Sequence, residues 1–215
     1  MMSIKFCKIA KHFNFLEILA FGFLMTHSRN YIFRSNERFK EVLMVGEGTG
    51  RFTKEFLCHY PHSKIVILEP SEKMRVKIRN SVDTTRYNVE VLDSKMEDFK
   101  STINFDLICT CFFWDCFSTK QIHDLEKNLR HLCQFTNMWY NVDFYESPKI
   151  CDLRTLYNFT ILRFLYFFFQ KFVFLKNSKI NSVHNLFCKN ELSLVKERVL
   201  PFPPIKSQLF KKACQ

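Results

Sequence analysis

Short apolar runs alternate with amphipathic stretches through the middle of this chain, between residues 41 and 148. The apolar runs are predicted strands, at 41–45, 64–68, 89–92, 105–111 and 138–144. Helical spacing of apolar residues predicts helices over 51–59, 72–80 and 120–132. Strands that alternate with helices in this way are typical of a parallel sheet with helical crossovers. The pattern therefore predicts an α/β fold, with a doubly wound, mostly parallel sheet flanked by helices.

The two ends of the chain differ from this middle region. An apolar stretch covers residues 13–25, and a strongly aromatic stretch covers residues 161–175. Both are shorter than the roughly 20 apolar residues of a membrane-spanning helix and contain polar or charged residues, so no transmembrane segment is expected. Peripheral contact with a membrane stays open. We expect an N-terminal helical cover over 1–40, a core over 41–148, and a helical lid with a terminal strand region over 149–215, all in one domain.

Composition adds a basic charge and a set of cysteines. The net charge of the 215 residues is +11, and the excess of Lys and Arg lies in the two flanks. A basic flank attracts nucleic acid, anionic lipid or an acidic substrate, but a lysine-rich coding bias produces the same excess without a partner. The nine cysteines show no CxxC spacing and follow no signal peptide, which favours a cytoplasmic location. Cys109, Cys111 and Cys116 lack partners at zinc-ligand spacing, so no metal is expected.

A glycine turn is the most informative local feature. Three of the chain's four glycines, Gly46, Gly48 and Gly50, directly follow the first predicted strand. A Gly-x-Gly-x-Gly turn in this place lets the backbone approach a ligand just outside the carboxyl end of the sheet. Glu69, at the end of the next strand, can accept hydrogen bonds from both hydroxyls of a ribose. The pattern predicts a nucleotide-type ligand, with a tight turn and an exposed strand end as the simpler alternative.

Four ordered segments extend this interpretation. They read VLMVGEGTGRF, VILEPSEKM, VEVLDSKMEDF and FDLICTCFFWDCF, and together they resemble the class I S-adenosylmethionine-dependent methyltransferases over residues 41–148. The FFWDCF sequence and the flanking aromatic segments are similar to small bacterial methyltransferase-domain proteins. The resemblance implies a Rossmann-like sheet, S-adenosylmethionine as cofactor, and methyltransferase activity. The dinucleotide fingerprint Gly-x-Gly-x-x-Gly, which would indicate NAD, has a different spacing.

The resemblance also assigns cofactor contacts to particular residues. The glycines approach the methionine part of the cofactor, Glu69 holds the ribose, and Met74 or Pro70 packs near the adenine. The complete set is Gly46, Glu47, Gly48, Thr49, Gly50, Glu69, Pro70, Met74, Met96 and Phe112.

Two positions depart from the pattern of the family. The acidic residue usual two places before the first glycine is Met44, and the one usual before the adenine-contacting backbone is Lys95, unless Asp93 replaces it. Loss of one charge-assisted hydrogen bond costs about 1.5–3 kcal/mol of binding free energy, which weakens cofactor binding without necessarily abolishing it.

The expected chemistry needs few catalytic residues, because the cofactor already carries a good leaving group. Asp115, just beyond the fourth strand, is the candidate proton acceptor, although a turn-capping role would explain it equally well. Tyr145, after the fifth strand, is the second candidate, and His27 or Tyr31 could reach the site from the N-terminal cover.

The aromatic lid predicts the kind of acceptor. Apolar walls favour a small lipophilic or aromatic molecule. A degenerate cofactor-binding scaffold is the main alternative, motivated by Met44 and Lys95. A nucleic-acid methyltransferase ranks lower, because no Asn/Asp-Pro-Pro-Tyr tetrapeptide follows the fourth strand. The sequence indicates neither the methylated atom nor an oligomeric state.

Overall fold

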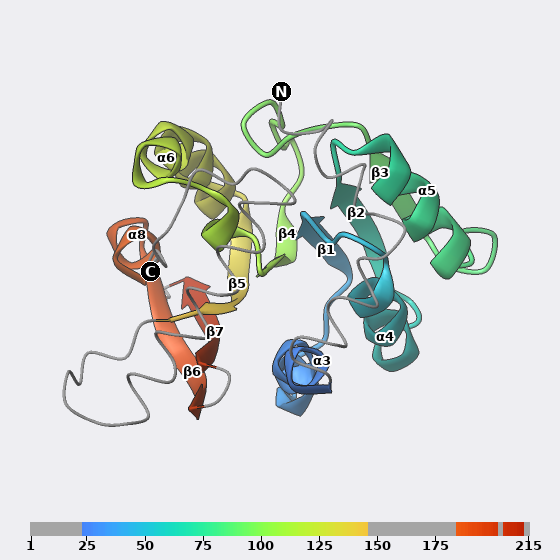
Figure 1. The fold of residues 1–215 in the computed structure, drawn as a ribbon, viewed down its shortest axis with the longest axis horizontal. Helices are drawn as coiled ribbons and strands as arrows, with labels where there is room; N and C mark the ends of the chain where they lie inside the picture. The colour runs from blue at the N-terminus through green and yellow to red at the C-terminus, as the bar shows by residue number, and fades with distance from the viewer. Residues whose placement is uncertain (1–22, 146–183, 202–203, 213–215) are drawn as a thin grey trace, which may run out of the picture.

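The computed structural model describes residues 23–145, 184–201 and 204–212, and Figure 1 shows their arrangement. Seven strands form one sheet in the order β3-β2-β1-β4-β5-β7-β6. The strands are β1 (Glu41–Val45), β2 (Lys64–Leu68), β3 (Val89–Leu92), β4 (Phe105–Cys111), β5 (Thr136–Phe144), β6 (Leu192–Pro201) and β7 (Pro204–Lys212). β1 to β5 are parallel to one another, whereas β7 is antiparallel to both β5 and β6. The predicted doubly wound, mostly parallel sheet is therefore confirmed.

Helices cover both faces of this sheet (Figure 1). One face packs against α3 (Phe23–Arg29), the 3-10 helix η1 (Asn30–Arg34), α4 (Arg51–His59) and α5 (Glu72–Ser81). The other face packs against the 3-10 helix η2 (Trp114–Cys116), α6 (Thr119–Gln134) and α8 (His184–Lys189). The chain thus forms three layers, and the carboxyl ends of β1 to β5 meet at one edge of the middle layer.

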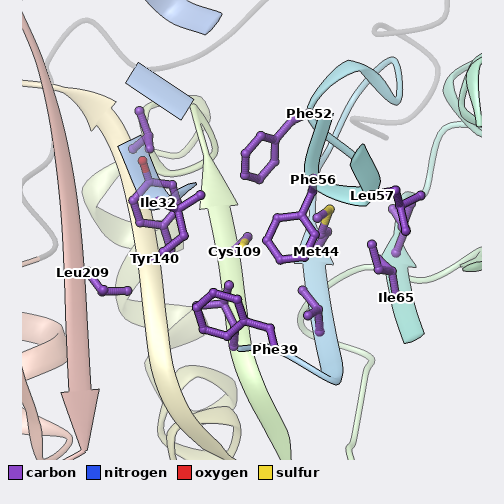
Figure 2. Packing of buried hydrophobic residues seen from close by; sticks show 14 of the residues in the cluster. Ile32, Phe39, Met44, Phe52, Phe56, Leu57, Ile65, Cys109, Tyr140 and Leu209 are labelled. Atoms are coloured by element: carbon purple, nitrogen blue, oxygen red, sulfur yellow. The ribbon is translucent and has the colours of Figure 1, made fainter. Parts of the chain in front are cut away.

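The alternation of side chains along the strands produces the two apolar cores. In β1, Val42 and Met44 belong to the core under α4, whereas Leu43 and Val45 belong to the core under α6. Strands buried on both faces read as continuous apolar runs, which is why the sequence reveals them clearly. Figure 2 shows Phe56 of α4 directed toward Met44 and the sheet.

A capping box sets the start of α6. The backbone N–H of Ser118 donates to the side-chain carbonyl of Gln121 at 3.0 Å, and the N–H of Gln121 donates to Ser118 Oγ at 3.3 Å. These bonds satisfy donors that the first helical turn leaves unpaired. The helix consequently begins at Thr119, one residue before the predicted start.

The flanks are described in part. Residues 1–22 of the predicted cover and residues 149–183 of the predicted lid, including Tyr166 and Phe168, lie outside the described residues. The terminal strand region contains β6 and β7, which extend the sheet beyond β5. In the part of the chain that the structure describes, no helix has both the length and the apolar character needed to cross a bilayer.

Candidate cofactor and acceptor site

The glycine turn joins β1 to α4 at the carboxyl edge of the sheet. Its three glycines all have positive φ: +67° at Gly46, +79° at Gly48 and +84° at Gly50. A Cβ on Gly46 would lie 2.7 Å from Cδ2 of Phe113, and one on Gly50 would collide with Ser81 and lie 3.1 Å from Cα of Ile78. The glycine pattern by itself predicts a closely bound ligand. The structure shows that the protein itself already requires two of them.

Glu47 folds back from this turn onto the start of α4. Its carboxyl accepts hydrogen bonds from the backbone N–H groups of Gly50 and Thr53, the latter at 3.0 Å. Burial raises the pKa of Glu47 to about 7. Met44, where the family has an acid, is itself buried and accepts a hydrogen bond from the Thr53 hydroxyl at 3.1 Å. The N-terminus of α4 therefore has a carboxyl beside it, but this carboxyl belongs to Glu47 in the glycine turn and not to a residue of β1.

Glu69 lies beside the turn, as predicted from the end of β2. Its side chain is only 7% exposed, and its carboxyl accepts hydrogen bonds from the backbone N–H groups of Ser71, at 2.9 Å, and of Gly48. Burial first, and the neighbouring Glu47 carboxyl second, raise the pKa of Glu69 to about 7. The two carboxyls thus lie close together on either side of Gly48.

Lys95, which departs from the family pattern, and Asp93, which could replace the missing acid, both form ion pairs. Asp93 pairs with Arg75 at 2.8 Å, and Arg75 also donates to the backbone carbonyl of Glu69 at 3.0 Å. Lys95 pairs with Glu97 at 3.7 Å on the exposed surface. Arg75 therefore links the end of β2 to the end of β3.

The remaining predicted cofactor residues differ in burial. Met74 of α5 and Met96 are each 2% exposed, and Met96 packs in the core under α6. Pro70 is partly buried, and the backbone carbonyl of Thr49 accepts a hydrogen bond from Ser81 Oγ at 3.0 Å. The structure brings the glycine turn and Glu69 together, and contacts of these other residues with a cofactor stay predictions.

The turn after β4 has strained backbone at Phe112, whose φ is +55°. A bulky residue rarely adopts this conformation, and such strain is typical of functional sites. Its N–H donates to the carbonyl of Val142 at 2.6 Å, its ring lies 5.1 Å from that of Phe144, and the Arg29 guanidinium lies 5.0 Å from the ring centre. Surrounding contacts therefore hold the strained residue in place.

Asp115 lies in η2 and interacts with a second acid that sequence reasoning missed, Asp143 at the end of β5. Asp143 is 4% exposed and accepts hydrogen bonds from the backbone N–H groups of Trp114, at 3.0 Å, and Phe144, at 2.9 Å. Burial raises the pKa of both carboxyls, and the charge of Asp115 raises that of Asp143 further. The sequence signal that could have identified Asp143 is an acidic residue within the last two positions of an apolar strand.

Asp115 also makes local contacts. The Cys116 thiol donates to Asp115 Oδ1 at 3.6 Å, and the carboxyl accepts from the backbone N–H of Cys116. These contacts fit the turn-capping alternative, whereas the neighbouring Asp143 fits a role in holding a proton.

The other candidates contact the β6–β7 hairpin. The ring of Tyr145 lies 5.1 Å from the Lys206 ammonium, and the Tyr31 hydroxyl donates to the carbonyl of Glu197 at 3.4 Å. Burial, with the charges of Arg198 and Arg34, lowers the pKa of His27. Among the described residues, no group of three or more His, Cys, Asp or Glu could hold a metal ion.

Comparisons with known proteins agree with this architecture. Residues 42–134 match the family model described as a methyltransferase domain. No curated protein matches the sequence. Among solved structures, the N-methyltransferase NodS from Bradyrhizobium japonicum WM9, in complex with S-adenosyl-L-homocysteine, is 11% identical with a TM-score of 0.59, over 89% of this chain and 86% of that one.

Two further structures share the fold. The mitomycin 7-O-methyltransferase MmcR is 13% identical with a TM-score of 0.64, over 89% of this chain and 55% of that one. An O-methyltransferase family protein from Burkholderia thailandensis is 10% identical with a TM-score of 0.65, over 88% of this chain and 56% of that one. The chain thus spans most of NodS and about half of the other two.

These findings agree with the resemblance that the motifs indicated. The fold is that of the class I S-adenosylmethionine-dependent methyltransferases. Residues 42–134 match a methyltransferase domain, and the cofactor that belongs to this fold is S-adenosylmethionine.

The position of Glu69 leads to a first prediction. Replacing Glu69 with alanine should weaken binding of S-adenosylhomocysteine by about 10- to 100-fold, because the ribose hydroxyls would lose their charge-assisted hydrogen bonds to the carboxylate. Calorimetric titration measures this change. Replacing the exposed Glu72, three residues further along the chain, is the matched control and should leave the affinity unchanged. Equal affinities for the Glu69→Ala variant and the wild type would remove Glu69 from the site.

Proposed function

We propose that this protein transfers a methyl group from S-adenosylmethionine to a small lipophilic or aromatic acceptor. When bound, the cofactor supplies a methyl group on a sulfonium, so the chain's own residues have to position the acceptor and remove a proton where the acceptor carries one. The observation that carries the proposal is the turn after β4, where the ring of Phe113 packs against the glycine turn and the carboxyls of Asp115 and Asp143 interact with each other.

Aromatic contacts support the apolar character of the acceptor. The ring of Phe113 packs directly against Gly46 and lies 4.8 Å from the ring of Phe117. Phe112 and Phe144 form a second pair. Walls of this kind favour an apolar molecule that a few polar groups orient.

Asp115 is the proposed proton acceptor, with Asp143 behind it. A general base works best when its pKa lies near the working pH, and burial moves both carboxyls in that direction. An oxygen or nitrogen nucleophile fits this role, since each loses a proton on methylation. Tyr145 and Tyr31, which contact the β6–β7 hairpin, and His27, which lies within the field of Arg198, are weaker candidates.

The residues of the turn also fit the cofactor itself. Glu69 accepts two backbone hydrogen bonds, and a carboxylate has about four acceptor sites, so it can still receive ribose hydroxyls. We assign the methionine part to the glycine turn and the adenine to the region of Pro70 and Met74. The name of one structural neighbour, a mitomycin 7-O-methyltransferase, supports a small acceptor.

Two other functions remain as alternatives. A degenerate scaffold would explain Met44 and Lys95, and it predicts that the cofactor does not bind. A nucleic-acid methyltransferase would explain the net charge of +11. The absence of an Asn/Asp-Pro-Pro-Tyr tetrapeptide after β4 argues against it.

A second prediction tests the cofactor assignment. Saturating S-adenosylhomocysteine, at about 100 times its Kd, should raise the Tm of the wild type by about 5–10 °C. Valine in place of Gly48 should remove this shift, because its side chain would project into the volume assigned to the cofactor, at a φ of +79° that valine rarely adopts. Alanine in place of the exposed Lys54 on α4 is the control and should keep the full shift. An unchanged Tm for the wild type would favour the scaffold.

The acceptor is tested by methyl transfer and by nucleic-acid binding. Release of S-adenosylhomocysteine in the presence of phenols, catechols or aromatic amines would support the proposal. Tight binding of RNA or DNA that weakens steeply with salt would overturn it, since neutralised phosphates release counterions. In that case Lys171, Lys176, Lys179 and Lys211 of the basic C-terminal flank are the residues to replace. Lys211 pairs with Glu37 at 3.3 Å, and the other three lie outside the described residues.

We also propose a cytoplasmic location. The described cysteines are free thiols: Cys58, Cys109, Cys111, Cys116, Cys133 and Cys188. Free thiols fit a reducing compartment.

A further inference from the structure

One face of the helical run from α3 into η1 carries three polar side chains in line. His27, Tyr31 and Arg34 are spaced four and three residues apart, so they lie above one another on the same side of this run. The Tyr31 hydroxyl donates to the backbone carbonyl of Glu197 at 3.4 Å. This row of side chains is therefore directed toward β6, the edge strand of the sheet.

Arg198 of β6 faces the row. It pairs in register with Ser207 of β7, and directly opposed residues of an antiparallel pair point to the same side of the sheet. The Ser207 hydroxyl donates to the backbone carbonyl of Ser28 in α3, so this side is the one that α3 covers. The guanidinium carbon of Arg198 lies 5.8 Å from the centre of the Tyr31 ring. Arg198 thus reaches the row across the boundary between β6 and η1.

The positive charge of this cluster has no paired acid. Among the described residues, neither Arg34 nor Arg198 forms an ion pair. Glu197 points to the other side of β6 and pairs with Lys206 at 3.7 Å. Burial, followed by the charges of Arg198 and Arg34, lowers the pKa of His27. Two permanent cations therefore act together on one imidazole.

Arg198 also has a hydrogen-bond donor that is buried and unused. Its Nη1 atom is shielded from solvent, and no acceptor in the part of the chain that the structure describes bonds to it. A buried donor in this state costs roughly 1–3 kcal/mol, and more when it is charged. An oxyanion that accepts from Nη1 would remove this cost and reduce the repulsion between Arg198 and Arg34.

The chemistry of the cluster selects a phosphate group. Two guanidinium groups match the charge of a dianion, and their planar donors match the spacing of phosphate oxygens. A single carboxylate would leave one of the two cations without a counter-charge. The imidazole of His27 supplies a further donor, because a nearby anion favours its protonated form. The Tyr31 ring offers an apolar surface to a group attached to the phosphate.

We propose that Arg198 and Arg34, with His27 beside them, form a binding site for the phosphate group of a small molecule. The site lies between η1 and β6, whereas the glycine turn and Glu69 lie at the ends of β1 and β2. The inference goes beyond the proposed function and does not depend on it. Free inorganic phosphate and a phosphate monoester supply the same oxygens to these donors.

Titration with inorganic phosphate, followed by NMR chemical shifts, tests the site. The wild type should bind phosphate with a Kd below about 1 mM. Arg198→Met should weaken binding by about 10- to 100-fold, because a buried charged donor is lost. Arg34→Met, at an exposed position, should weaken it by about 2- to 5-fold. Arg198→Lys keeps the charge without the planar donors and should lie between the wild type and Arg198→Met.

A control and a reporter locate the bound anion. Arg79→Met removes an exposed arginine from α5 and should bind phosphate as the wild type does. Saturating sulfate, which stays a dianion from about pH 5 to 8, should raise the pKa of His27 in the wild type but not in Arg198→Met. The other charged groups near α3 and η1 are Lys196, on the same side of β6, and Glu55 of α4, which is hydrogen-bonded to η1. Both are present with and without sulfate, so their effect cancels in the comparison.

Phenyl phosphate distinguishes the two sources of the group. Binding about 5-fold tighter than that of inorganic phosphate would indicate a monoester packed on Tyr31, and equal or weaker binding would indicate free phosphate. No binding by the wild type at about 10 mM, or equal affinities of the wild type and Arg198→Met, would overturn the site. An equal loss in Arg79→Met would also overturn it, because binding would then follow net charge alone.

The measurements remain decisive if a variant is unstable. An unchanged Tm shows that Arg198→Met is folded, and if it is not, Arg198→Lys and Arg34→Met give the comparison. None of these titrations contains the cofactor or an acceptor. Failure of the phosphate site therefore leaves the proposed methyl transfer standing, and failure of methyl transfer leaves the phosphate site standing.

Discussion

Replacing Gly50 with alanine is expected to lower the free energy of unfolding by about 2–5 kcal/mol. The new Cβ would adopt a φ of +84°, which strains an L-residue, and would press against the backbone of Ile78 and the side chain of Ser81. The backbone contact does not relax by a change of rotamer. Urea unfolding followed by circular dichroism measures the loss.

Two variants show whether this mechanism is correct. Alanine at the exposed Asn80 of α5 is the control and should change the free energy of unfolding by less than about 0.5 kcal/mol. The double variant Gly50→Ala/Ser81→Ala should lose less free energy of unfolding than the sum of the two single variants, because Ser81→Ala removes one of the colliding groups. A cost below about 1 kcal/mol for Gly50→Ala alone would show that α4 and α5 can separate at this point.

The second large effect concerns pH. Burial raises the pKa values of Glu47 and Glu69 to about 7, from a model-peptide value near 4.5. Between about pH 4.5 and 7 the folded protein holds protons that the unfolded chain has lost, so the free energy of unfolding falls as the pH rises through this window. Each carboxyl contributes up to about 3 kcal/mol to this fall. Well above pH 7 the carboxyls are ionised in both the folded and the unfolded state, and this contribution becomes constant.

The affinity for the cofactor should, in contrast, rise with pH. Ribose hydroxyls donate to an ionised Glu69, so the affinity for S-adenosylhomocysteine should be about 10-fold higher at pH 8 than at pH 6. Titrations at pH 6, 7 and 8 measure the trend. Glu69→Gln, which keeps the shape of the side chain without the charge, should flatten it. A wild-type affinity independent of pH would mean that Glu69 is already ionised in the free protein.

The core of the fold could be predicted from the sequence because its strands are buried on both faces. Residues 64–68, KIVIL, and 105–111, FDLICTC, are continuous apolar runs, and the structure places strands over the same residues. Glu69 was identified for a similar reason, since it directly follows one of these runs. Local patterns of this kind depend on neighbours in the chain, which a sequence displays directly.

The parts that could not be predicted depend on contacts between distant segments. Asp143 becomes notable only because it binds the backbone of Trp114 across the ends of β4 and β5. Arg29 looks like any basic residue of the flank until α3 is placed on the sheet. Similarly, the residues of β6 gave no indication that β7 would separate β6 from β5.

That placement of β7 affects how the chain reaches its native state. β6 and β7 pair from Pro201 and Pro204 outward, so this hairpin closes over a short connection and should form within about 1–10 μs. Pairing of β7 with β5 requires closure of a loop of about 60 residues and is therefore the slower step. Until the hairpin docks, the edge of β5 remains open to solvent with unpaired backbone groups. Early intermediates of this protein should therefore aggregate through β5, and conditions that favour the hairpin should improve the yield on refolding.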